Sequence, residues 1–153
     1  MMHHVRIISA CLATAGIFVY LATLRPDQAP RTSSGVMQNC DIQRGPCTQP
    51  LGSGSATLEI LPRPVRAMRD LTFRITLAVD PADGSTLSAP PYIDLDMPDM
   101  FMGYNRVHLT PERPGIWSGT GVIVRCPSGI PTWKAVLTVP DTGETVFVFD
   151  VRY

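Results

Sequence analysis

The feature that most constrains the fold is a two-residue period of apolar side chains beyond residue 56. Within residues 71–79, leucine, phenylalanine, isoleucine, leucine and valine occupy every second position, with threonine, arginine and alanine between them. Side chains of a β-strand point alternately to opposite faces of the sheet, so this pattern indicates a strand with one buried face. The chain must therefore bury that face against a second layer.

The same period recurs in short segments that are separated by turn residues. The chain contains 15 prolines and 12 glycines, which interrupt the alternation and leave little helical periodicity. We expect seven strands, at residues 57–60, 71–79, 93–97, 106–110, 116–124, 133–139 and 146–153. This spacing is typical of an immunoglobulin-like antiparallel β-sandwich, which we assign to residues 56–153. The pattern leaves open whether Trp117 faces the core.

The N-terminal segment is apolar enough to enter a membrane. Residues 7–24 contain no charged side chain, and 18 residues of helix span about 27 Å. No convincing small-x-small cleavage site follows Leu24, although cleavage stays an alternative. We expect residues 1–24 to be a transmembrane signal anchor in the inner (cytoplasmic) membrane, with the domain facing the periplasm or cell exterior. Residues 25–55 would then form a linker and an arm.

Two closely spaced cysteines, Cys40 and Cys47, lie in this arm. In an exported compartment such a pair usually forms a disulfide, and closing so short a loop is worth about 2.5 kcal/mol in the chain-entropy model. This pairing would leave Cys126 as a free thiol, whereas a bridge from Cys126 to either cysteine is the alternative. The spacing is not Cys-x-x-Cys, so a redox role is not indicated.

A cluster of methionines follows the third expected strand. Met97, Met100 and Met102 fall within six positions. Soft thioether ligands select Cu(I), so the cluster suggests a copper site, whereas the alternative is that the methionines fill gaps in the core. Met97 continues the inward-facing series of its strand, and Met100 and Met102 lie in the loop that follows.

Strand direction brings other sulfur-bearing residues to the same end. If the strands alternate in direction, every second connection lies at one end of the sandwich. Three such connections carry Met68, the methionine cluster and Cys126. We therefore expect a Cu(I) site formed from Met97, Met100, Met102, Met68 and Cys126. His108 is a further candidate, but a lone outward histidine is more simply a solvated side chain.

Charge and motifs exclude several classes of function. The 13 Lys and Arg residues are balanced by 13 Asp and Glu, which removes the positive field expected of a nucleic-acid-binding protein. No phosphate-binding glycine loop, His-Glu-x-x-His or Gly-x-Ser-x-Gly motif is present, so we predict that the protein is not an enzyme. Asp94, Asp96 and Asp99 could suggest a calcium site, but the first two fall on the outward face of a strand, where charges keep it soluble.

Three segments resemble the YtkA-like and FixH-like domains of bacterial envelope proteins. They are Asp-Leu-Asp-Met-Pro-Asp-Met-Phe-Met-Gly at 94–103, Pro-Gly-Ile-Trp-Ser-Gly-Thr-Gly at 114–121 and Trp-Lys-Ala-Val-Leu-Thr-Val at 133–139. The resemblance covers roughly residues 56–153 and implies an immunoglobulin-like domain behind one membrane anchor. It also implies copper handling or assembly of cytochrome oxidases, with copper bound by Met97, Met100 and Met102. Asp99 and the absence of histidine depart from the family's common Met-Pro-Gly-Met-x-His segment.

The sequence thus predicts a membrane-anchored, non-enzymatic protein that binds Cu(I) or delivers it to a protein partner. The alternative is an interaction module of the bacterial envelope, without a metal. In that case the methionines would pack the core or form a docking patch for a partner.

Overall fold

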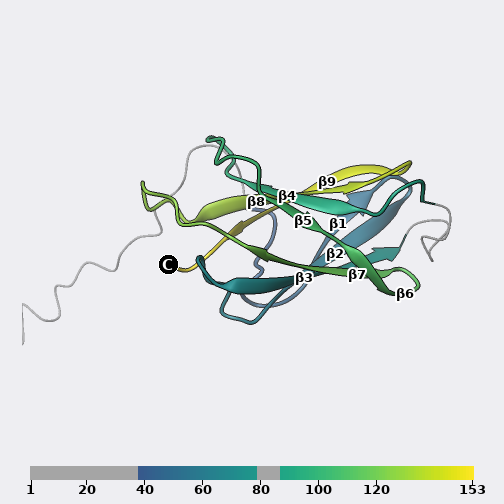
Figure 1. Cartoon of the computed structure of the whole chain (residues 1–153), viewed down its shortest axis with the longest axis horizontal. Helices are drawn as coiled ribbons and strands as arrows, with labels where there is room; N and C mark the ends of the chain where they lie inside the picture. The colour runs from purple at the N-terminus through teal and green to yellow at the C-terminus, as the bar shows by residue number, and fades with distance from the viewer. Residues whose placement is uncertain (1–37, 79–86) are drawn as a thin grey trace, which may run out of the picture. The chain divides into compact units, whose positions relative to one another are not determined.

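The computed structural model describes residues 38–78 and 87–153, which form two antiparallel sheets packed face to face (Figure 1). All of these residues belong to one compact unit, Ser33–Tyr153. The expected anchor at residues 1–24, and its linker as far as residue 37, lie outside the described residues. Within the described ranges, no helix is long and apolar enough to cross a membrane.

Nine strands make up the sheets of the described residues. The larger sheet has the order β1-β2-β3-β7-β6, and the smaller has the order β5-β4-β8-β9. Their bounds are β1 Cys47–Leu51, β2 Gly54–Leu61, β3 Asp70–Ala78, β4 Tyr92–Asp96, β5 Arg106–His108, β6 Thr110–Arg113, β7 Ile116–Val122, β8 Thr132–Val139 and β9 Gly143–Asp150. Every hydrogen-bonded pair of strands is antiparallel. The prediction of an all-β sandwich is therefore confirmed.

Alternating side chains from both sheets fill the space between them. The largest fully buried side chains are Phe73 from the larger sheet and Trp133, Phe147 and Phe149 from the smaller. Trp117, whose direction the alternation left open, also faces this core. Burial of apolar area contributes roughly 25 cal/mol per Å², so these aromatic side chains are the main cohesive contacts between the layers.

The predicted number of seven strands is wrong by two. β1 lies in the segment that was assigned to a linker and arm, so the sandwich begins before residue 56. Pro50 concealed this strand, because proline is tolerated at the edge of a sheet but interrupts the usual strand signal. The single strand expected at residues 106–110 is in fact two strands, β5 and β6, which lie in different sheets. The chain crosses from one layer to the other at Leu109.

Two glycines of β7 allow β5 to pass close to this strand. A Cβ atom at Gly119 would overlap the carbonyl oxygen of His108, and one at Gly121 would lie 2.5 Å from a methyl carbon of Val107. A larger residue at Gly119 would require the backbone to move, and one at Gly121 would require the side chain of Val107 to move. The close passage therefore explains why glycine interrupts the apolar period of β7.

Residues 38–46 cover the free edge of β9. The backbone amides of Asn39 and Cys40 donate to the carbonyl oxygen of Val148, and the side chain of Asn39 accepts from the amide of Val148. A disulfide joins Cys40 to Cys47 at the start of β1, with an S–S distance of 2.10 Å. An uncovered edge strand invites pairing with other chains, and this segment prevents it while tying the two sheets together. The predicted disulfide is confirmed.

We expect Gly119→Ala to lower the free energy of unfolding by about 1–3 kcal/mol, the usual cost of overpacking. The added methyl group meets backbone, which cannot rotate away as a flexible side chain would. Gly45→Ala is the matched control, because a Cβ atom there meets nothing within 4 Å. Urea denaturation measures both variants, and equal stabilities would contradict the close passage of β5 over β7.

Changing both Cys40 and Cys47 to serine should lower the free energy of unfolding by about 2–3 kcal/mol, since the lost cross-link no longer restricts the unfolded chain. Thermal unfolding with and without a reductant provides the control. The reductant should lower the melting temperature of the wild type and leave that of the double variant unchanged. A wild-type protein that is equally stable when reduced would contradict this role of the disulfide.

Candidate functional site

Three connections meet at one end of the sandwich, which we call the loop end: residues 62–69, 97–105 and 123–131. The first joins two strands of the larger sheet, the second joins two strands of the smaller sheet, and the third crosses from one sheet to the other. Pairing of Asp70 with Val122, and of Asp96 with Lys134, aligns the strand ends that carry these loops. Figure 1 shows this end at the left. The predicted convergence of the three loops is confirmed.

Hydrogen bonds hold the three loops to one another. The amide of Met68 donates to the carbonyl oxygen of Ile123 at 2.8 Å, and the side-chain amide of Asn105 donates to the carbonyl oxygen of Val122 at 2.9 Å. The carbonyl oxygen of Asn105 also accepts from the amide of Leu95 at 2.8 Å. The loops therefore have fixed backbone anchors at the points where they leave the sheets.

The methionine cluster is divided between the core and the surface. Met97 is only 3% exposed, Met102 is partly buried and packs against the core, and Met100 is 44% exposed. The prediction that Met97 faces inward is confirmed. In the antiparallel register of β4 against β8, Asp96 pairs with Lys134. The inward residue of β8 that comes nearest to Met97 in this register is therefore Trp133, which is fully buried.

Asp96 holds the methionine loop in position. Its carboxylate accepts a hydrogen bond from the amide of Met102 at 2.9 Å and lies 3.8 Å from the ammonium of Lys134. Asp94 instead makes two hydrogen bonds of 2.8 Å with Arg106, and these raise the pKa of the Arg106 guanidinium. Across residues 38–78 and 87–153, no three His, Cys, Asp or Glu side chains lie close enough together to hold a metal ion. Asp94 and Asp96 thus have structural partners.

Cys126 is a free, buried thiol at the start of a tight turn. The amide of Gly129 closes the turn by donating to the carbonyl oxygen of Cys126 at 3.0 Å, and Gly129 has a φ of 72° that favours glycine. The hydroxyl of Ser128 lies 2.8 Å from the thiol sulfur. Hydrogen bonds from this hydroxyl, and from the backbone of residues 128–130, lower the pKa of Cys126 against the opposing effect of burial. The turn therefore stabilises the thiolate more than solvent does, although burial opposes it.

Met68 has a different environment from the other sulfur-bearing residues. It is 66% exposed and lines a hollow of about 250 Å³ together with Arg66, Arg69 and Arg125. Three guanidinium groups oppose the binding of a metal cation here, because like charges repel. The sequence signal for this hollow is the run from Arg63 to Arg69, which contains three arginines in seven positions.

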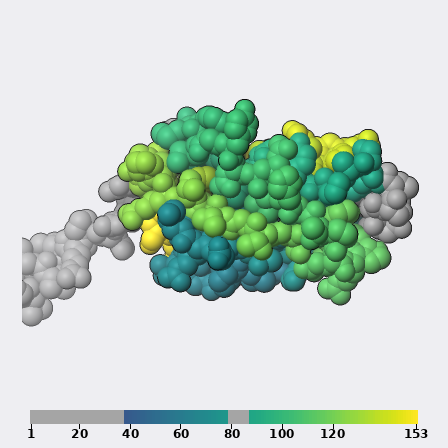
Figure 2. All heavy atoms as spheres, viewed as in Figure 1, coloured from purple at the N-terminus to yellow at the C-terminus, as the bar shows by residue number. Residues whose placement is uncertain are grey.

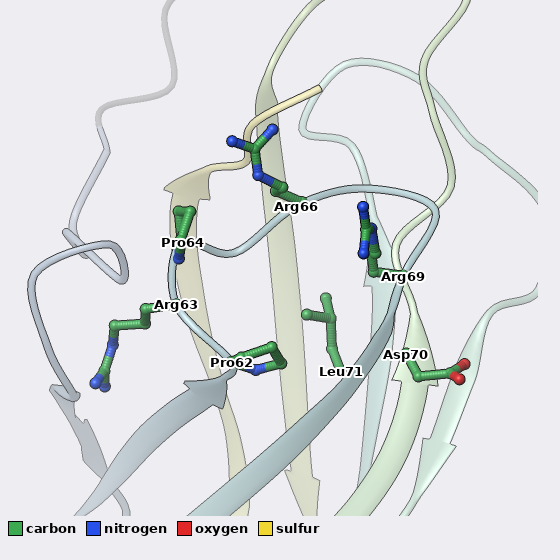
Figure 3. A pocket seen from close by; sticks show the side chains of 7 residues that line it. All are labelled: Pro62, Arg63, Pro64, Arg66, Arg69, Asp70 and Leu71. Carbon is green, nitrogen blue, oxygen red and sulfur yellow. The ribbon is translucent and has the colours of Figure 1, made fainter.

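A second hollow of about 420 Å³ shares Arg66 and Arg69 with the first. Figure 3 shows that Pro62 and Leu71 lie close together at its base, whereas the guanidinium groups of its arginines point in different directions. Arg63, on its rim, is bound to Glu59 through a 3.1 Å ion pair. This hollow has an apolar base and a positively charged rim.

The structure thus buries Met97 and Cys126 in the core and packs Met102 against it, whereas Met68 and Met100 face solvent. His108 is exposed at the end of β5 that is remote from the loop end. Comparison of the chain with protein-family models, with curated proteins and with solved structures finds no match. The chemistry of the site therefore rests on its donor atoms, which are the thiol of Cys126 and the thioether of Met97 in the core and the thioether of Met102 packed against it.

We expect Asp96→Ala to release the methionine loop, because the amide of Met102 loses its acceptor. Hydrogen exchange at that amide should become at least tenfold faster, which corresponds to about 1.4 kcal/mol of lost local stability. Asp94→Ala is the matched control on the same face of β4, and it removes only the exposed ion pair with Arg106. Equal exchange at the amide of Met102 in both variants would show that Asp96 does not hold the loop.

Proposed function

We propose that this domain binds Cu(I) at the loop end through Cys126, Met97 and Met102, and that it delivers the ion to a partner protein. The observation that carries the proposal is the free Cys126 thiol, which the Cys40–Cys47 disulfide leaves available. A thiolate with two thioethers is the soft donor set that selects Cu(I) over harder ions. Thioethers bind without losing a proton, so only Cys126 makes the affinity depend on pH.

Burial supports these three ligands over the set of five sulfur-bearing residues that the sequence predicted. Met97 and Cys126 belong to the core cluster, and Met102 packs against it. An apolar surrounding excludes water and lowers the local dielectric, which strengthens the interaction between a thiolate and a cation. Met100 is exposed two residues before Met102, so we assign it a role in the entry of the ion. Met68 is omitted because of the arginines beside it.

The order of the strands supports an immunoglobulin-like fold, as in the YtkA-like and FixH-like domains. Strands β2, β3, β7 and β6 follow the order A, B, E, D of an immunoglobulin constant domain, and β4, β8 and β9 follow the order C, F, G. β5 and β1 extend the two sheets at their edges. We further propose that residues 1–24 anchor this domain in the inner membrane, where a partner in copper handling or oxidase assembly would receive the ion.

Anaerobic titration of the full-length protein with Cu(I), in competition with a coloured Cu(I) chelator, tests the ligand set. Ascorbate is a suitable reductant, because a thiol reagent would open the disulfide. Cys126→Ser, and the pair Met97→Leu with Met102→Leu, should each weaken binding by roughly tenfold to 100-fold, on the order of 1.4–2.8 kcal/mol. Leucine matches methionine in volume, so the core should be retained.

Met68→Leu is the matched control, because it removes a methionine from the same end of the sandwich but from the arginine-lined hollow. Its affinity for Cu(I) should equal that of the wild type. Unchanged affinity in Cys126→Ser would overturn the proposed copper site. An equal loss in Met68→Leu would overturn the proposed choice of ligands.

A further inference from the structure

The exposed apolar side chains of the described residues are concentrated at the loop end. Seven large apolar side chains are exposed, and Val146 on β9 is the single one that lies elsewhere. The other six are Met68, Met100, Phe101, Tyr104, Ile130 and Tyr153. Tyr153 belongs to this group because β9 ends at Asp150, which pairs with Thr132 at the start of β8. Exposed apolar residues scattered singly need no explanation, but a gathered set marks an interaction surface.

Phe101 and Tyr104 form the most exposed part of this surface. They are 69% and 100% exposed, and their rings are in edge-to-face contact with centroids 5.6 Å apart. The loop that carries them is fixed by the bonds of Asp96 to Met102 and of Leu95 to Asn105. The aromatic pair is therefore held outside the core on an anchored loop.

Arginines without acidic partners lie beside two of these apolar side chains, Met68 and Tyr153. Arg66, Arg69 and Arg125 line the hollows of the loop end, and Arg152 forms a β-bridge with Arg66. In the described part of the chain, none of these four forms an ion pair with a carboxylate. Asp70 and Asp99 are exposed acids at this end, and Asp41, in the segment that contacts residues 63–65, is paired with Arg44. The surface is therefore both aromatic and positively charged.

We infer that the loop end docks on the surface of an anionic phospholipid bilayer. Aromatic rings are favoured at the depth of the headgroups, and each basic residue near an anionic membrane contributes about 1 kcal/mol. The guanidinium groups in Figure 3 do not converge on one point, which suits many phosphates across a surface better than one bound anion. In Figure 2 the three loops form one continuous end of the domain, coloured green, yellow-green and teal.

The expected membrane anchor would bring the loop end near a bilayer but would not fix whether the loop end faces that bilayer. The 13 residues between residues 24 and 38 reach at most about 45 Å when extended. The backbone enters the described domain beside Val148, two residues before the end of β9, and Val148 pairs with Lys134, which also pairs with Asp96 at the loop end. The chain therefore enters close to the loop end, and docking would select one orientation among those that the linker permits. The inference is independent of the copper proposal, because it uses none of the three proposed ligands.

Hydrogen exchange of the full-length protein with nanodiscs tests this inference. The discs contain phosphatidylcholine alone or phosphatidylcholine mixed with phosphatidylglycerol. Amides of residues 62–69 and 97–105 should exchange several-fold more slowly with the anionic discs, and this protection should decrease as salt is added. The turn at residues 140–142, at the opposite end, is the internal control and should not change.

Two pairs of substitutions separate the contributions of charge and apolar contact. Arg66→Gln with Arg69→Gln, and Phe101→Ser with Tyr104→Ser, should each abolish the difference between the two kinds of disc, whereas Arg66→Lys with Arg69→Lys should retain most of it. The matched controls are Arg113→Gln and Val146→Ser, which change an exposed arginine and an exposed apolar side chain away from the loop end. All of these side chains are exposed, so the core is left intact.

Equal exchange of the two loops with neutral and anionic discs would overturn the inference. Protection that appears without lipid and increases with protein concentration would also overturn it, because a second copy of the chain would then cover the surface. The inference would also fail if Arg113→Gln or Val146→Ser abolished the difference in exchange between the two kinds of disc. Cu(I) affinity measured on the Phe101→Ser, Tyr104→Ser variant should be unchanged, so the two proposals can fail separately.

Discussion

Burial of alternating apolar side chains between the two sheets is the constraint on which the rest of the structure depends. It fixes the register of β3 against β7 and of β4 against β8, because a shift by one residue would turn every buried side chain outward. Once these registers are set, the strand ends at Asp70 and Asp96 are fixed as well. The loop end is thus a product of core packing, and its side chains are presented by a rigid frame.

The sequence pattern predicted most of the fold because the signals were local. Alternation within β3, the close spacing of Cys40 and Cys47 and the inward position of Met97 each require only neighbouring residues. The division of one expected strand into β5 and β6 could not be predicted this way. It depends on the contact of His108 with Gly119, which lie in strands of different sheets.

The candidate site was predictable in its position but not in its burial. Antiparallel direction was enough to bring the three loops to one end, since the argument needs only the order of the strands. Which sulfur faces the core depends on the path of each loop, and this is set by bonds such as those from Met102 to Asp96 and from Met68 to Ile123. The arginines beside Met68 were visible in the sequence, but Arg125 joins them only through folding.

The covering of the β9 edge by residues 38–46 has a mechanical consequence. A pull on the chain at residue 38 is resisted first by the hydrogen bonds of Asn39 to β9, and once these break the disulfide transmits the tension from Cys40 directly to Cys47 and β1. The intervening loop, which buries Ile42 in the core, lies outside the path of the force. A force applied at this side of the domain therefore leaves this part of the packing in place, because a covalent bond carries the tension.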